Sequence, residues 1–105
     1  MASHSAQVTV LYPQKEGSTF DIDYYHNNHL PLCEKHWKPF GLKSWNVTQF
    51  DSAAPYSFCL VADFETLEGF QKASADPSIA EIMADVPKYS SEQPVLLAGA
   101  VVSRG

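Results

Sequence analysis

The chain has few basic residues: seven Lys and Arg among its 105 residues, against twelve Asp and Glu, for a formal net charge of −5. The basic residues are scattered, which argues against nucleic acid and anionic membrane surfaces as partners. No apolar run approaches the roughly 20 residues needed to cross a bilayer. The first seven residues have neither the charged nor the apolar region of a secretory signal. We therefore expect a cytoplasmic protein that binds neither nucleic acid nor membranes.

Cysteine is also scarce, with only Cys33 and Cys59, and their spacing gives no support for a structural zinc site. In the cytoplasm both are expected to be free thiols, and their apolar neighbours favour buried, unreactive side chains. The composition, 45% hydrophobic and 18% charged, is typical of a soluble globular protein. The length predicts a single domain, with a core over residues 7–103.

The pattern of apolar residues and turn residues predicts an α+β chain in the order β-α-β-β-α-β. This is the ferredoxin-like pattern, which gives a four-stranded antiparallel sheet with both helices on one face. Asp21 and Thr66 are expected to cap the two helices, and Pro31 to kink the first one around His29–Leu30. The expected strands are 7–12, 42–50, 56–64 and 94–103, and the expected helices are 22–37 and 67–75, followed by a short helical piece at 78–84.

The face of the sheet that carries no helices is also expected to be buried against another protein surface. The last strand is apolar on both faces, as in sheets that are covered twice. A second copy of the chain is the simplest cover, so we expect a homodimer in which two sheets pair into a barrel. On strand 42–50, strict alternation places Leu42, Ser44 and Asn46 on one face and Trp45 on the other.

The first predicted helix carries three of the four histidines, His26, His29 and His36. On a helix, Tyr25 and Cys33 share a face with His29. A metal site made of His26, His29 and Cys33 is geometrically possible. The nearest carboxylates lie off this stripe, so we expect no metal.

A set of short motifs runs along the chain: Phe20-Asp21, Tyr24-Tyr25 and His29-Leu30-Pro31-Leu32, with Leu11-Tyr12-Pro13, Glu16-Gly17, Gly41-Leu42, Phe64, Leu67–Phe70 and Asp85–Tyr89. Together these motifs resemble the EthD family, which belongs to the dimeric α+β barrel superfamily, and the resemblance spans about residues 8–102. It implies a pocket between helices and sheet that binds a hydrophobic small molecule. Other members of the superfamily act without cofactors as isomerases, cyclases, decarboxylases or monooxygenases.

Two residues are the candidate catalytic groups. The resemblance implies that His29 lines the cavity, where it would act as a general acid and base on a carbon next to a carbonyl or on a phenol. The alternative is a buried histidine with a structural role. Tyr25 would bind a substrate oxygen or orient His29, unless it is a tyrosine of the core. Tyr24 is predicted to serve packing only.

Five further residues are candidates for substrate binding: His26, Cys33, Ser44, Asn46 and Tyr89. His26 would influence the charge of His29, or simply be solvated. Ser44 and Asn46 reach the pocket if their strand face points at the helices, and lie at the dimer interface if it does not. Tyr89 would bind the ligand or clamp the partner subunit.

The leading functional hypothesis is a small enzyme, free of cofactors, that acts on an aromatic, quinone-like or polyketide ring. The reaction would be a decarboxylation, cyclisation, isomerisation or oxygenation. One alternative is a protein without catalytic activity that binds a small molecule for an oxygenase pathway. Another alternative is a barrel that binds haem.

Overall fold

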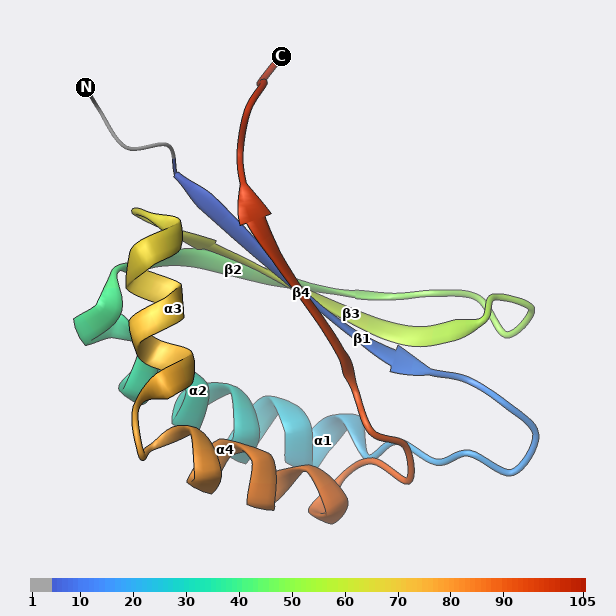
Figure 1. Ribbon diagram of the computed structural model, residues 1–105. Coiled ribbons are helices and arrows are strands. Elements are labelled where there is room, and N and C mark those ends of the chain that lie inside the picture. Colours follow the sequence, from blue (N-terminus) through green and yellow to red (C-terminus); the bar gives the residue numbers. More distant parts are fainter. Residues whose placement is uncertain (1–4) are drawn as a thin grey trace.

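The computed structural model describes residues 5–105, which form a four-stranded antiparallel sheet with helices on one face (Figure 1). The strand order is β2-β3-β1-β4, so β1 and β3 lie in the centre of the sheet. This order confirms the predicted ferredoxin-like α+β fold. The strands are β1 (Ala6–Pro13), β2 (Leu42–Gln49), β3 (Tyr56–Phe64) and β4 (Val95–Ala100).

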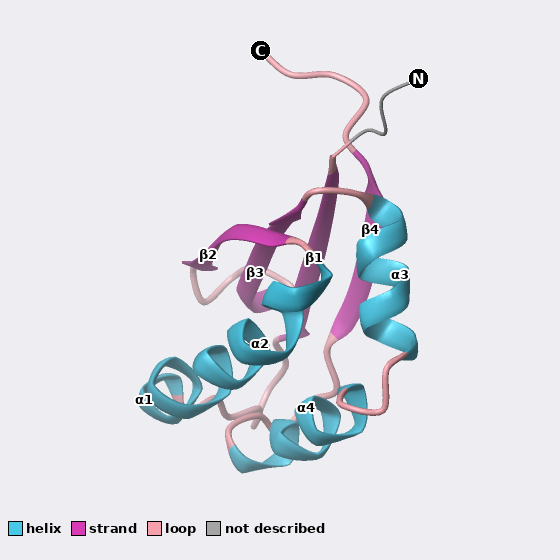
Figure 2. Cartoon of the chain, turned by 90° about the vertical axis from the view of Figure 1, so that its left-hand side faces the viewer, coloured by secondary structure: helices cyan, strands magenta, loops and turns pink. Residues whose placement is uncertain are grey.

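The helices lie on the same side of the sheet in both views (Figures 1 and 2). The two predicted caps are confirmed: Asp21 accepts a hydrogen bond from the backbone of Tyr24 at 3.1 Å, and Thr66 accepts one from Gly69 at 3.0 Å. No helix of the described residues is long and apolar enough to span a membrane. The helical segments are α1 (Ile22–Tyr24), the π-helical η1 (Tyr25–His29), α2 (Leu30–Trp37), the 3₁₀ segments η2 (Lys38–Phe40) and η3 (Val86–Lys88), α3 (Leu67–Ala75) and α4 (Ile79–Asp85).

A π-helical turn stands where the sequence predicts a kink. The N–H of Leu30 donates to the carbonyl of Tyr25, five residues earlier, so the helix is wider over η1. Pro31 has no N–H, and in a regular α-helix its ring would clash with the carbonyl four residues before it. The wide turn relieves this conflict, and such turns often occur at functional sites. His29 is the last residue of this turn.

A bulge in β2 makes one sequence prediction wrong. Leu42 pairs with Phe64, but Ser44 already pairs with Asp63, so the register shifts between them. Leu42 and Trp45 therefore both lie on the helix side, whereas Ser44 and Asn46 lie on the opposite face. Strict alternation along the strand does not anticipate this change.

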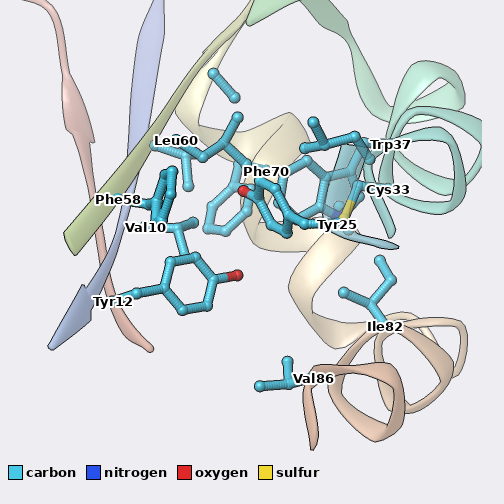
Figure 3. Close-up of a cluster of buried hydrophobic side chains, with 14 of the residues drawn as sticks. Val10, Tyr12, Tyr25, Cys33, Trp37, Phe58, Leu60, Phe70, Ile82 and Val86 are labelled. Atoms are coloured by element: carbon cyan, nitrogen blue, oxygen red, sulfur yellow. The ribbon is translucent and has the colours of Figure 1, made fainter. Parts of the chain in front are cut away.

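The core fills the space between the sheet and the helices (Figure 3). Alternate residues of the two central strands point into it, and aromatic side chains form much of its volume. The side chains labelled in Figure 3 come from every layer: Val10, Tyr12, Phe58 and Leu60 from the sheet, and Tyr25, Cys33, Trp37, Phe70, Ile82 and Val86 from the helices.

The edge strand β4 is exposed along its whole length. It pairs only with β1 and ends at Ala100, opposite Ala6, where β1 begins; it is therefore shorter than the predicted 94–103. Leu97, on the face without helices, is 56% exposed, and Leu96, on the helix face, is 43% exposed. Residues 101–105 extend beyond the end of β4 (Figure 1). The apolar surface that the sequence predicts to lie against a second subunit is therefore exposed in the single chain.

Candidate functional site

His29 and Asp85 form a buried pair at the end of the sheet–helix core. The His29 Nδ1 lies 2.9 Å from Asp85 Oδ2, and His29 is only 3% exposed. His29 closes the π-helical turn, and Asp85 is the last residue of α4. A carboxylate at Nδ1 orients an imidazole and fixes its tautomer, so Nε2 is left to accept a proton.

Two more side chains hold the Asp85 carboxylate. The Tyr24 hydroxyl donates to Asp85 Oδ1 at 2.7 Å, and Lys88 Nζ lies 3.7 Å from the same oxygen. Burial acts to raise the pKa of Asp85, but the hydrogen bonds from Tyr24 and His29 and the positive charge of Lys88 act to lower it and outweigh burial. The pKa of Asp85 therefore lies below its ordinary value, and the group is a carboxylate at neutral pH.

The charge state of His29 follows from the same surroundings. Burial lowers its pKa, and this effect outweighs the hydrogen bond and the charge of Asp85, which act to raise it. At neutral pH, His29 is therefore a neutral imidazole that donates Nδ1–H to Asp85. Such a group is ready to act as a base through Nε2.

Aromatic rings surround this pair. The Tyr25 ring is stacked with His29 at a centroid distance of 5.5 Å, and the Tyr89 ring lies 4.5 Å from His29. The Tyr89 and Tyr12 hydroxyls are hydrogen-bonded at 2.6 Å. Burial raises the pKa of all three tyrosines, so each keeps its proton and can donate it in a hydrogen bond.

The Tyr25 hydroxyl is the unusual member of this group. It is fully buried, and it forms no hydrogen bond of good geometry among the described residues. The neighbouring hydroxyl is that of Tyr12, whose ring lies 5.7 Å from that of Tyr25 and which is already bonded to Tyr89. Buried polar atoms are almost always paired, so an unpaired one requires an explanation. A ligand oxygen would supply the missing acceptor.

The other predicted binding residues divide into three groups. Tyr89 lies against His29, and its predicted role in binding a ligand stays a prediction. Cys33 lies in the core, where burial raises the pKa of its thiol to about 12, so the thiol keeps its proton at neutral pH. His26 is exposed, and Ser44 and Asn46 lie on the far face of the sheet, so none of these three reaches the His29 pair.

The space between α2 and the sheet is nearly filled. A cavity of only about 10 Å³ remains there, lined by residues that include Cys33, Trp37 and Trp45. This volume holds at most one water molecule. His29 is itself buried and does not line this cavity, so a ligand at His29 requires side chains to move.

Sequence reasoning placed Asp85 in a family motif but gave it no role in the site. Tyr24 packs against the core, as predicted, and its hydroxyl in addition holds Asp85. Asp85 is 56 residues from His29 along the chain, and no local pattern links them. One feature of the sequence could have revealed its role: Asp85 is an acidic residue within the otherwise apolar segment 82–86. A charged side chain in such a segment is rarely buried unless it is paired.

Comparison with known proteins gives matches among solved structures alone. No protein-family model matches the sequence, and no curated protein matches it. An EthD-like protein from Ralstonia eutropha is 27% identical, with 98% of this chain and 96% of that chain covered and a TM-score of 0.82. An ethyl tert-butyl ether D (EthD) family protein from Bacillus halodurans is 23% identical, with 93% and 99% covered and a TM-score of 0.70.

Two more distant structures share the fold. A dimeric ferredoxin-like protein of unknown function from Thermobifida fusca is 17% identical, with 94% of this chain and 92% of that chain covered and a TM-score of 0.61. A mutant of SnoaB, a cofactor-independent oxygenase from Streptomyces nogalater, is 10% identical, with 98% and 97% covered and a TM-score of 0.59. The chain therefore has the ferredoxin-like fold of the EthD-family proteins.

Proposed function

We propose that this protein is a small enzyme that needs no cofactor and uses His29 as a general acid and base. Its substrate would be a small aromatic, quinone-like or polyketide ring. The observation that carries this proposal is the buried contact of 2.9 Å between His29 Nδ1 and Asp85. The cofactor-independent oxygenase of the same fold is consistent with such chemistry but does not identify the reaction.

The reaction step that these residues support is a proton transfer. His29 Nε2 takes a proton from a phenol oxygen or from a carbon next to a carbonyl, and the resulting imidazolium is stabilised by the Asp85 carboxylate. The same Nε2–H then returns the proton at another position of the ring. The unpaired hydroxyl of Tyr25 donates to the substrate oxygen on which negative charge develops.

The exchange of ring hydrogens tests this proposal before the natural substrate is identified. Resorcinol is a planar phenol whose ring C–H groups exchange with D₂O through a keto form, and NMR follows their loss. We expect the protein to accelerate this exchange, and His29→Ala to reduce the acceleration by about 10²–10⁴-fold, the usual contribution of a general base. Unchanged exchange in His29→Ala would refute the role of His29. The control is His26→Ala, which removes an exposed histidine one turn away.

A binding protein without catalytic activity is the second candidate. The observation that favours it is the 3% exposure of His29, because an open active site would leave the base accessible. This candidate predicts a ligand that stabilises the protein and no acceleration of exchange in any variant. Haem binding, the third function expected from the sequence, stays a prediction that a Soret shift would test.

A homodimer is part of the proposal. The exposed apolar residues of β4 lie beside a surface groove of about 720 Å³, between the C-terminal residues and the face of β1 that the helices do not cover. An uncovered apolar surface on a small protein is typical of a subunit interface. The dimeric ferredoxin-like protein of similar fold supports this arrangement. A cytoplasmic location suits the two buried free thiols, Cys33 and Cys59.

A further inference from the structure

The partly buried ring of Phe20 packs against four other aromatic rings, although Phe20 belongs to neither a strand nor a helix. It follows the loop after β1 and immediately precedes the helix cap Asp21. Its ring is stacked on Phe58 at 4.2 Å with an angle of 22° between the planes. It meets Tyr12 and Tyr25 edge to face, each at 5.0 Å, and Tyr89 at 5.3 Å. Phe20 therefore occupies a slot that accepts one planar ring.

This slot separates two hollows at the surface. One hollow, of about 140 Å³, is lined by Phe20, Phe58 and Ser90 among others. The second, of about 440 Å³, lies on the side of Tyr89 and Lys88, and Phe20 lines it as well. Withdrawal of the Phe20 ring would join them into one site of the size that small-molecule ligands use.

Residues 15–20 lie between two anchored ends: Gln14, whose backbone and side-chain N–H groups donate to the carbonyls of Pro55 and Ala54 at 2.8 Å each, and the helix cap Asp21. Few bonds join the segment between these ends to the rest of the protein. The Ser91 N–H donates to the Thr19 carbonyl at 3.1 Å, the Thr19 N–H donates to Ser91 Oγ at 2.8 Å, and the Asp21 N–H donates to the Tyr89 carbonyl at 2.7 Å. The ion pair that also joins the two loops, Lys15 with Glu92, has an exposed lysine and adds little. Gly17, with a φ of +82°, supplies a backbone conformation that other residues rarely adopt.

We propose that the slot filled by Phe20 is the binding place of a single aromatic ring that bears an oxygen, a phenol or quinone, and that residues 15–20 form a lid over it. The ring would stack on Phe58, and its oxygen would accept the hydrogen bond that the buried Tyr25 hydroxyl lacks. Tyr25 and Tyr89 each touch both Phe20 and His29, so these two rings lie between the bound ring and the base. Any reaction of the bound ring rests on the proposed function of His29, whereas the binding of the ring does not.

A reversible lock tests the lid. The variant Thr19→Cys/Ser91→Cys joins two exposed residues whose backbones are already hydrogen-bonded, a suitable distance for a disulfide. The native cysteines are buried and do not compete. The probe is p-cresol, with cyclohexanol as a ring of similar size that is not planar, and amide NMR shifts report binding. The single variant Thr19→Cys, treated in the same way, controls for oxidation.

We expect p-cresol to bind the native protein and the reduced double variant, and to bind the oxidised variant at least about tenfold more weakly. Phe20→Ala should bind p-cresol about tenfold more tightly, because it removes the competing ring. Phe50→Ala, which removes an exposed ring from the rim of the smaller hollow, should bind it as the native protein does.

Three results would each overturn this proposal. They are equal affinity in the oxidised and reduced double variant, equal affinity for cyclohexanol and p-cresol, and no binding of p-cresol to the native protein. The variant His29→Ala separates the two proposals. If it binds p-cresol normally while exchange of resorcinol is unaffected by the mutation, the acid–base function fails and the slot stands.

Discussion

The substitution Asp85→Asn measures what the buried pair contributes to stability. The carboxylate accepts from the Tyr24 hydroxyl at 2.7 Å and contacts His29 Nδ1 at 2.9 Å, while its side chain is 10% exposed. Asparagine keeps the shape, but it loses the charge and turns an amide N–H₂ toward one of these two donors. Leaving a buried donor that was bonded to a carboxylate without its acceptor costs about 3 kcal/mol. For a domain of this size, such a loss lowers the Tm by about 15 °C.

The matched control is Glu81→Gln, which breaks the second contact between a histidine and a carboxylate, at 3.1 Å to His36. The side chain of Glu81 is 60% exposed, so water replaces the lost partner and the effect on stability should be small. Urea titrations of both variants at pH 7 give the two free energies of unfolding. If Asp85→Asn costs no more than Glu81→Gln, the burial argument for the pair is wrong.

Three further predictions concern the fold, the pH dependence and the dimer. Gly69→Ala should destabilise the protein, since a Cβ there would lie 2.3 Å from the carbonyl oxygen of Phe40; thermal unfolding tests this, and an unchanged Tm contradicts it. His29 has a folded-state pKa below 6.5, so the unfolded chain binds more protons and stability should fall as the pH drops below about 6.5. His29→Gln should flatten this part of a urea-titration series across pH, whereas His26→Gln should not. Leu97→Asp should give a monomer in analytical ultracentrifugation, and an unchanged dimer would place the interface elsewhere.

Local chemistry explains what the sequence predicted correctly. The caps Asp21 and Thr66 lie three residues from the N–H groups that they bind, so the pattern is visible in the sequence. The conflict at Pro31 was also visible, since its missing N–H is a local property. The sequence did not reveal that a π-helical turn would resolve the conflict and end on His29.

Features that depend on distant contacts were not predictable in this way. The bulge in β2 depends on how this strand pairs with β3, and it moved Ser44 and Asn46 to the face away from the helices. Asp85 reaches His29 only because α4 packs beside the first helix, and Phe20 reaches Phe58 from a loop. Each of these requires the register or the tertiary packing, which no window of sequence contains.

The most direct test of the central claim is the tautomer and pKa of His29, measured from its imidazole ¹⁵N shifts in the intact protein. We predict a neutral ring at pH 7, with the proton on Nδ1 toward Asp85 and none on Nε2, and a pKa below 6.5. An imidazolium at pH 7, or a proton on Nε2, would contradict the assignment of His29 as the base.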